Sequence, residues 1–358
     1  MSMNAEIKNA EIKPYRISVG DDVLDDLKSR LRKTRWPEAE LVGDWSQGAP
    51  LKWIKDVCRY WAEDYDWRER EAKLNRFAQF TTDIDGLGIH FLHVRSKHPD
   101  AMPLIITHGW PGSVVEFHKV IEPLTDPTAH GGNAADAFHV VCPSLPGFGF
   151  SEKPVVSGWG VDRIASAWAV LMDRLGYARY GAQGGDWGSA VTTALGAQDP
   201  DHCAGIHITL AMGARPNVEG QPTPQEARAL QGLKYYADWD SGYSKQQSTR
   251  PQTLGYALTD SPSGQAAWIL EKFWAWTRLR RTSGKHPRPG RTARQCHAVL
   301  GDGDRRLVGA TLLGELWPEA PYRAQGHGTD RSRRLPQGDR DAGAQVDGAQ
   351  LHQHPALA

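Results

Sequence analysis

The stretch Gln183-Gly184-Gly185-Asp186-Trp187-Gly188-Ser189 decides the fold of this chain. Residues 175–181 before it can form a short strand, and residues 190–195 after it favour the start of a helix. Strand, sharp turn and helix are the setting of a nucleophile elbow, in which the nucleophile lies on a strained turn between small residues. We therefore expect Gly184 and Gly188 where any side chain would clash, and Asp186 at the tip of the turn.

A carboxylate at an elbow indicates a particular chemistry. Asp186 in place of serine or cysteine would attack a carbon electrophile, such as an epoxide or an alkyl halide, and form an ester that water must then open. The competing interpretation is structural, since an acid in a glycine-rich loop can simply cap the helix that follows it.

Composition sets outer limits on the function. The chain has 358 residues, of which 40% are hydrophobic, enough for one large domain with an inserted subdomain. Lys plus Arg equals Asp plus Glu at 42 each, so charge gives no case for nucleic acid or an anionic membrane as partner. The four cysteines form no CxxC pair, and neither a metal site nor a cofactor is expected. The lack of a long apolar run predicts no membrane span and a cytoplasmic protein.

Toward the N-terminus, residues 1–12 are predicted to be a flexible tail and residues 13–75 a helical extension that packs on the main domain. Asp21 or Asp22 can cap a first helix ended by Pro37, with Leu24, Leu27 and Leu31 at helical spacing. A second helix would place Ile54, Val57, Cys58 and Trp61 on one face. Five tryptophans in this region indicate packing rather than a ligand site: Trp36, Trp45, Trp53, Trp61 and Trp67.

Residues 76–214 carry the pattern of an α/β core. Residues 77–84 and 88–94 are rich in β-formers around Asp85-Gly86, which predicts a hairpin. Strands are expected at residues 103–107 and 139–142, with helices at residues 114–124 and around Ile164, Trp168, Leu171, Met172 and Leu175. Strands alternating with helices predict a mostly parallel sheet with the elbow at the carboxyl end of a strand.

A glycine-containing loop, His108-Gly109-Trp110-Pro111-Gly112-Ser113, follows the strand at residues 103–107. An oxyanion hole needs two backbone N–H groups, one from the residue after the nucleophile and one from such a loop. Trp187 and Trp110 are the candidates. We expect His108, a single histidine at a strand end, to bond backbone rather than act as a base.

These motifs together resemble the microsomal-type epoxide hydrolases, an α/β-hydrolase family with a helical N-terminal extension. The resemblance lies in the loop at residues 108–113, the segment 143–151 (PSLPGFGFS) and the elbow, and it continues through residues 240–243, 247–253 and 260–277. It implies an α/β-hydrolase core, a partial helical cap at residues 215–277, and Asp186 as nucleophile. It also implies that Tyr243 is one of two cap tyrosines that donate a proton to the epoxide oxygen; Tyr235 and Tyr236 lie nearby.

The resemblance stops at about residue 278. From Arg278 onward there are 13 Arg and one Lys, and no Phe, Ile or Met. One allowed back-translation of residues 294–301 encodes Asp-Asn-Val-Met-Leu-Tyr-Trp in another frame, which resembles the family at that place, so we interpret residues 278–358 as an aberrant, disordered segment produced by a frameshift. The histidine base and its acid partner stay unassigned. Candidates are His286, His297, His327, His352 and His354 for the base, and Glu315 and Glu319 for the acid.

The sequence thus predicts an epoxide hydrolase that forms vicinal diols through an Asp ester, impaired by loss of the histidine and acid pair. Its partners would be a small apolar epoxide and water, and self-association into a homo-oligomer stays open. One alternative is a haloalkane dehalogenase, which shares an elbow aspartate but holds a halide with Trp or Asn donors. The other is a non-catalytic remnant whose sheet lacks its last strands.

Overall fold

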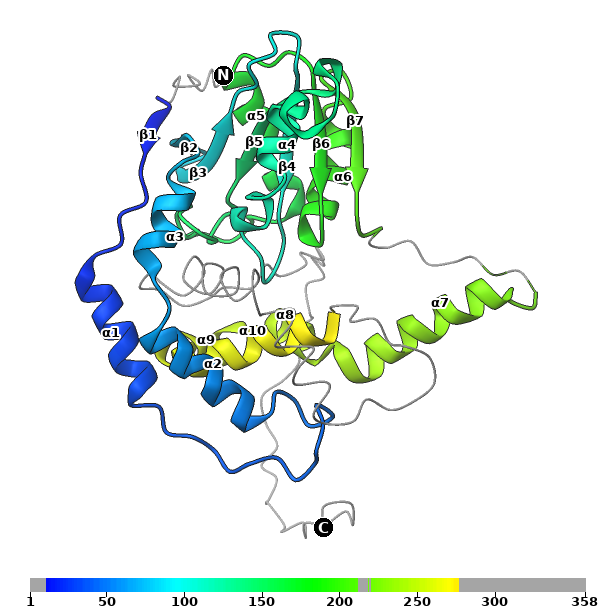
Figure 1. The fold of residues 1–358 in the computed structure, drawn as a ribbon. Coiled ribbons are helices and arrows are strands. Elements are labelled where there is room, and N and C mark those ends of the chain that lie inside the picture. Colours follow the sequence, from blue (N-terminus) through cyan, green and yellow to red (C-terminus); the bar gives the residue numbers. More distant parts are fainter. Residues whose placement is uncertain (1–10, 212–217, 219, 277–358) are drawn as a thin grey trace, which may run out of the picture. The chain divides into compact units, whose positions relative to one another are not determined.

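The computed structural model describes residues 11–211, 218 and 220–276 (Figure 1). Seven strands form one sheet in the order β1-β2-β3-β5-β4-β6-β7. Their bounds are β1 Lys13–Tyr15, β2 Gln79–Ile84, β3 Leu87–Val94, β4 Met102–Thr107, β5 Phe138–Pro143, β6 Tyr180–Gly184 and β7 Cys203–Ile208. The three pairings from β5 through β4 and β6 to β7 are parallel, and the three that join β1, β2, β3 and β5 are antiparallel. The expectation of a mostly parallel sheet was therefore wrong, because the hairpin enters the same sheet.

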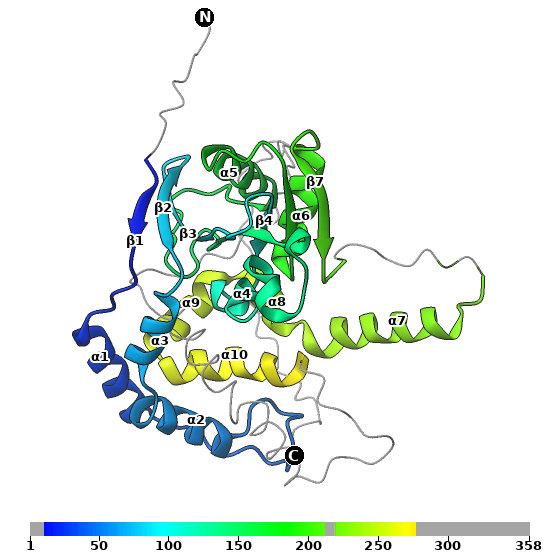
Figure 2. The same ribbon diagram turned by 45° about the horizontal axis from the view of Figure 1, so that its top comes forward.

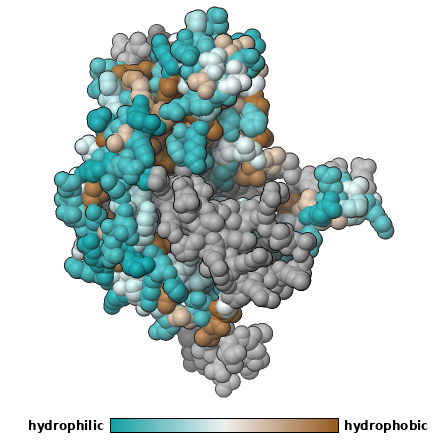
Figure 3. Space-filling view, in the orientation of Figure 1, coloured by the Kyte–Doolittle hydropathy of each residue, from teal (hydrophilic) through white to brown (hydrophobic). Residues whose placement is uncertain are grey.

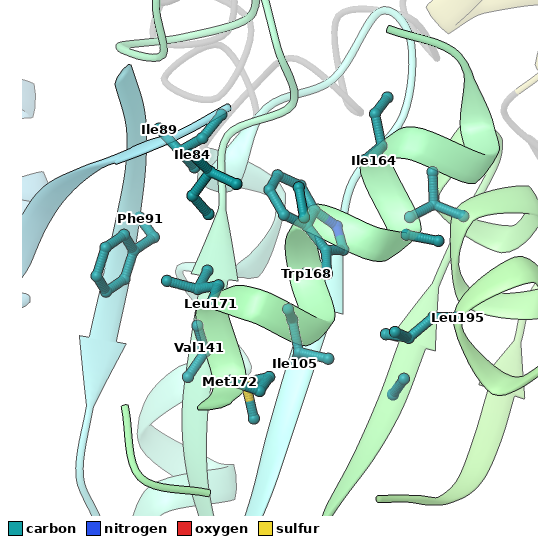
Figure 4. Packing of buried hydrophobic residues seen from close by; sticks show 14 of the residues in the cluster. Ile84, Ile89, Phe91, Ile105, Val141, Ile164, Trp168, Leu171, Met172 and Leu195 are labelled. Carbon is teal, nitrogen blue, oxygen red and sulfur yellow. The ribbon is translucent and has the colours of Figure 1, made fainter. Parts of the chain in front are cut away.

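Neighbouring residues of the central strands point to opposite faces of the sheet, as a period of two requires. Phe91, Ile105 and Val141 pack with α5 (Val161–Arg174) and α6 (Trp187–Gln198), as Figure 4 shows around Trp168. On the other face, the next or preceding residues Leu92, Ile106, Val140 and Cys142 pack with the 3-10 helix η1 (Val114–Phe117) and α4 (Ile121–Thr125). The sheet is thus covered on both faces, and its strand ends remain for a site.

The N-terminal helices are α1 (Asp21–Arg32), α2 (Leu51–Glu63) and α3 (Trp67–Leu74). Their buried side chains share a core cluster with Ala266, Ile269 and Leu270 of α10 (Pro262–Trp276), which lies alongside α1 and α2 in Figures 1 and 2. The ring of Trp45 stacks on Trp274 at 4.7 Å. The extension thus packs largely on the cap-region helix α10. From the α/β core, the buried residue in this cluster is Val115. The expectation of packing on the main domain missed this long-range pairing.

The predicted tryptophan positions are packing residues. Trp45, Trp53, Trp61 and Trp67 are buried, and Trp36 packs against the same cluster. The outer surface of this helical region is mostly hydrophilic (Figure 3), as expected when the apolar side of each helix faces inward. Helix α1 begins at Asp21 after Gly20, without a side-chain cap, and ends at Arg32, before Pro37. Capping by Asp21 or Asp22 and a helix running to Pro37 were therefore wrong.

Turn chemistry explains three further boundaries. Asp85 and Gly86 both have positive φ, 54° and 75°, which is the type I′ turn expected of a tight hairpin, so the predicted hairpin is confirmed. Gly176, with φ 79°, ends α5: its N–H donates to the Asp173 carbonyl and that of Tyr177 to Met172. The elbow strand consequently starts at Tyr180, later than residues 175–181 suggested.

The single helix predicted over residues 114–124 is instead two short ones, η1 and α4. Pro123 has no N–H to donate to the carbonyl four residues earlier, so a continuous helix would lose a bond and meet a clash there. Pro123 is accommodated because it falls in the first turn of α4. Two short 3-10 helices follow, η2 (Pro127–His130) and η3 (Ala134–Asp136).

The cap region is helical in the part that the structure describes. It contains α7 (Pro224–Tyr235), the π-helix η4 (Tyr236–Asp240), α8 (Gly242–Thr249), α9 (Pro251–Asp260) and α10. Thr223 and Glu226 form a capping box at the start of α7. Across the described residues, every helix is too short or too polar to serve as a membrane span. The predicted domain boundaries remain predictions, and residues 278–358 lie outside the described residues.

Candidate active site

The elbow at Asp186 is built by two glycines. Asp186 has φ 50° and ψ −125°, an uncommon backbone conformation for a residue with a side chain, between the end of β6 and the start of α6. A Cβ at Gly184 would overlap the carbonyl of Gly188, and a Cβ at Gly188 would lie 2.7 Å from the His108 carbonyl oxygen and closer still to that of Thr107. The predicted need for glycine at both positions is confirmed.

Register brings the elbow to the loop at residues 108–113. Thr107, the last residue of β4, pairs with Gly184, the last residue of β6. The loop that follows β4 and the elbow that follows β6 therefore leave the sheet side by side. A Cβ at Gly109 would lie 2.5 Å from both Cβ and Oδ1 of Asp186. Only a glycine allows the loop to approach the carboxylate this closely.

Two backbone N–H groups bond the Asp186 carboxylate. Trp110 N–H donates to Oδ1 at 2.9 Å, and Trp187 N–H bonds the same carboxylate. Burial raises the pKa of Asp186 above its ordinary 3.8, while these two bonds act in the opposite direction. The predicted oxyanion donors therefore meet at one carboxylate, and Trp187 also begins α6, whose N-terminus favours negative charge.

Both ring nitrogens of His108 bond backbone groups, and they join two loops. His108 is buried, and its Nε2 accepts a hydrogen bond from Leu145 N–H at 3.1 Å, which leaves Nδ1–H to donate to the Gly109 carbonyl at 3.1 Å. Burial lowers the pKa of His108 to about 4, so it is neutral at physiological pH. The expectation that His108 bonds backbone is confirmed.

Tyr243, in α8, packs on the loop that holds Asp186. Its ring stacks on Trp110 at 4.8 Å with an interplanar angle of 12°, and it meets Trp276 edge-on at 5.3 Å. Its hydroxyl lies 3.1 Å from that of Tyr236. Burial, followed by the bond to Tyr236, raises the pKa of Tyr243, so the phenol carries its proton at neutral pH. The structure thus brings Tyr243 to the residue that also contacts Asp186.

A buried ion-pair cluster supports Tyr243, and sequence reasoning missed it. Lys272 Nζ lies 2.7 Å from Asp240 Oδ1, 2.8 Å from Glu271 Oε2 and 5.0 Å from the centre of the Tyr243 ring. Lys272 is only 6% exposed. The available signal was a lysine inside the apolar run of α10, where an unpaired charge would be costly.

Glu116 is a second residue that the sequence did not single out. It lies in η1, and its carboxylate folds back over Gly112, where a Cβ would overlap Oε1. Part of the residue is exposed to solvent. Burial of the carboxyl group is the larger cause that raises the pKa of Glu116 to about 7, and the negative charge of Asp186 is the smaller one. Both acids meet the turn at residues 109–112, Asp186 at Gly109 and Glu116 at Gly112.

The remaining candidates cannot be placed. The five histidines from His286 to His354, together with Glu315 and Glu319, lie outside the described residues. So do residues 294–301, which stand where the resemblance calls for the second cap tyrosine. Among the described residues, no group of three or more His, Cys, Asp or Glu side chains could hold a metal ion. The described residues therefore bring together a carboxylate, two backbone donors and a phenol.

Comparison with known proteins gives consistent matches. Residues 12–117 match the family described as "Epoxide hydrolase N terminus", and residues 102–259 match the alpha/beta hydrolase fold. Epoxide hydrolase 1 of Sus scrofa is 37% identical over 295 residues, 77% of this chain and 65% of that protein. A Stigmatella aurantiaca protein, provisionally named an epoxide hydrolase, is 58% identical over 270 residues, 74% of this chain and 61% of its own length.

Among solved structures, juvenile hormone epoxide hydrolase from the silkworm Bombyx mori aligns with a TM-score of 0.69 and 32% identity, over 86% of this chain and 77% of that one. The chain spans less than two thirds of the two curated relatives named above. The loop at residues 108–113 lies within both family matches, and the elbow lies within the alpha/beta hydrolase match.

Proposed function

Since this chain belongs to the epoxide hydrolase family, we propose that it converts a small apolar epoxide and water to a vicinal diol through an ester on Asp186. The observation that supports this most directly is the Asp186 carboxylate, bonded by Trp110 and Trp187 N–H groups. Oδ1 accepts the Trp110 N–H, and a carboxylate held by backbone donors still has lone pairs with which to attack carbon.

In the first half-reaction, Asp186 forms a bond to an epoxide carbon while the carbon–oxygen bond of the ring breaks. The epoxide oxygen takes the proton of Tyr243, which leaves a hydroxy-ester and a tyrosinate. A phenol is a suited donor because the alkoxide that develops is far more basic than a phenolate. Stacking of Tyr243 on Trp110 supports this role, since it holds the phenol near the loop that binds Asp186.

In the second half-reaction, water attacks the Asp186 ester carbon and gives one proton to a base. The tetrahedral oxyanion would be stabilised by Trp110 and Trp187 N–H groups. Collapse breaks the bond between that carbon and the alkyl oxygen, and the alkoxide takes the proton from the base. The acid form of Asp186 then returns its proton to the tyrosinate. The sum is one epoxide and one water consumed for one diol.

The test is a mass measurement after mixing the chain with styrene oxide. We expect the peptide that carries Asp186 to gain the mass of the epoxide, and Asp186→Asn to gain none. An equal adduct in Asp186→Ala would assign the attack to another residue. Release of bromide from an alkyl bromide, without reaction with epoxide, would favour the haloalkane dehalogenase alternative, which the phenol of Tyr243 disfavours. The cytoplasmic location and any homo-oligomer stay predictions from the sequence.

A further inference from the structure

The carboxylate of Asp240 binds two residues that contact the proton donor Tyr243. We propose that Asp240 is a positioning residue for the first half-reaction. By binding Lys272 and Trp276 together, it fixes the phenol of Tyr243 where the epoxide oxygen receives its proton. This inference rests on the proposed function, because the step concerned is ester formation on Asp186.

Both oxygens of the Asp240 side chain bind α10. Lys272 Nζ lies 2.7 Å from Oδ1, and the indole N–H of Trp276 donates to Oδ2 at 2.8 Å. Lys272 Nζ also donates to the backbone carbonyl of Asp240 at 3.4 Å. Only 16% of the Asp240 side chain is exposed, so solvent screens the ion pair little. We call Asp240, Lys272 and Trp276 the clamp.

The α10 side of the clamp is fixed in place by packing. Lys272 and Trp276 are four residues apart, so they lie on the same face of the helix. Buried side chains from the earlier turns of α10 belong to the core cluster of the N-terminal helices. Asp240 is therefore bound to a helix that cannot shift without disturbing that core.

The clamp contacts the ring of Tyr243 directly. Lys272 Nζ lies 5.0 Å from the ring centre, within the range of a cation–π interaction, and the Trp276 ring meets it edge-on at 5.3 Å. Tyr243 and Trp276 both pack on Trp110, at 4.8 and 6.2 Å between ring centres. Since Trp110 N–H donates to Asp186 Oδ1, contacts run without a break from the clamp to the nucleophile.

The backbone between Asp240 and Tyr243 is short and held. Two residues separate them, at the junction of the π-helix η4 with α8. Turns of π-helix are rare and often occur at functional sites. At the junction, Ser241 is buried and its hydroxyl donates to the Ala237 carbonyl at 2.9 Å. Because a displacement of about 1 Å can slow a reaction by roughly 10²-fold, the constraint at Asp240 bears on proton transfer from Tyr243.

The experiment measures the rate of adduct formation on Asp186 by the full chain at several concentrations of styrene oxide. Asp240→Asn removes the charge that binds Lys272. Lys272 keeps Glu271 at 2.8 Å as its ion-pair partner, so the substitution leaves no buried cation unpaired. Asp238→Asn is the matched control, because Asp238 lies in the same π-helix but belongs to an exposed ion pair.

We expect Asp240→Asn to slow the maximal rate of ester formation by roughly 10- to 10²-fold. The epoxide concentration that gives half of that rate should change little, because Asp240 does not contact the substrate. Trp276→Phe should slow ester formation in the same way, since it keeps an aromatic ring beside Tyr243 and loses only the indole N–H. Asp238→Asn should react at the parent rate.

A second measurement separates positioning from a loss of folded protein. Asp240→Asn is combined with Tyr243→Phe, so that no phenol remains to be positioned. In that background, Asp240→Asn should slow ester formation by less than about twofold, because the two residues act on one step and their effects do not add. Loss of folded protein would slow ester formation by the same factor in both backgrounds. Trp276→Phe takes the place of Asp240→Asn in this comparison if the latter does not fold.

Two results would overturn the inference alone: ester formation in folded Asp240→Asn at the parent rate, or equal slowing with and without the Tyr243 hydroxyl. Failure of the parent chain to form any adduct would instead refute the proposed function, and this inference with it.

Discussion

Substitution of Gly188 by alanine should lower the free energy of unfolding, whereas alanine at a glycine with open space around it should not. The added methyl group would lie 2.7 Å from the carbonyl oxygen of His108 and from the carbonyl carbon of Thr107, and closer still to the Thr107 oxygen. Real Cβ atoms are not found within 3.0 Å of such atoms. Because backbone cannot rotate away as a side chain can, α6 must separate from the end of β4.

Overpacking of a close-packed interior typically lowers the free energy of unfolding by about 1 to 3 kcal/mol. Because the atoms that the new methyl group meets are backbone, we expect a loss of about 3 kcal/mol for Gly188→Ala. That is a large part of a total free energy of unfolding of roughly 5 to 15 kcal/mol. Gly205→Ala in β7 is the control, since a Cβ there meets nothing within 4 Å, and alanine in a strand should be neutral or stabilising by up to about 1 kcal/mol.

The assay is urea unfolding of both variants followed by circular dichroism, together with the rate of adduct formation on Asp186. We expect a lower unfolding midpoint and a slower alkylation for Gly188→Ala only, because the same shift that relieves the clash moves Trp187 N–H away from the carboxylate. Equal midpoints for Gly188→Ala and Gly205→Ala would show that the elbow tolerates the methyl group and that the reasoning from close approach is wrong.

Other outcomes are expected at the site. Tyr243→Phe should slow ester formation by roughly 10² to 10⁴-fold while binding of substrate changes little. Stopped-flow alkylation at several epoxide concentrations measures both, and an unchanged rate would mean that another residue donates the proton. Because burial raises the pKa of Asp186, alkylation should increase with pH through a midpoint above 3.8 and then level off, and removing the charge in Asp186→Asn should raise thermal stability at pH 7. Lys272→Met should destabilise the chain by about 3 kcal/mol because Asp240 and Glu271 lose their cation, whereas Lys234→Met, in an exposed pair with Asp238, should change stability by less than about 1 kcal/mol in the same urea titration. Resequencing the gene across codons 270 to 300 should reveal a frameshift, and the corrected chain should form diol faster than the present one; an intact reading frame would contradict that interpretation.

The sequence by itself determined the elements whose signals are local. Glycines around Asp186 predicted the elbow because a turn of that conformation excludes side chains, and Asp85-Gly86 predicted the hairpin because both residues tolerate positive φ. Apolar spacing correctly placed Ile164, Trp168, Leu171 and Met172 on the buried face of one helix. Motif order was specific enough to indicate the family before any geometry was known.

Tertiary structure decided what depends on residues far apart in the chain. Pairing of Thr107 with Gly184 brings the two loops together, and no spacing in the sequence measures that register. Packing of the N-terminal helices on α10 and stacking of Tyr243 on Trp110 join residues separated by more than a hundred positions. Contacts of Asp186 and Glu116 with the turn at residues 109–112 likewise depend on how that loop folds, which the order of residues does not specify.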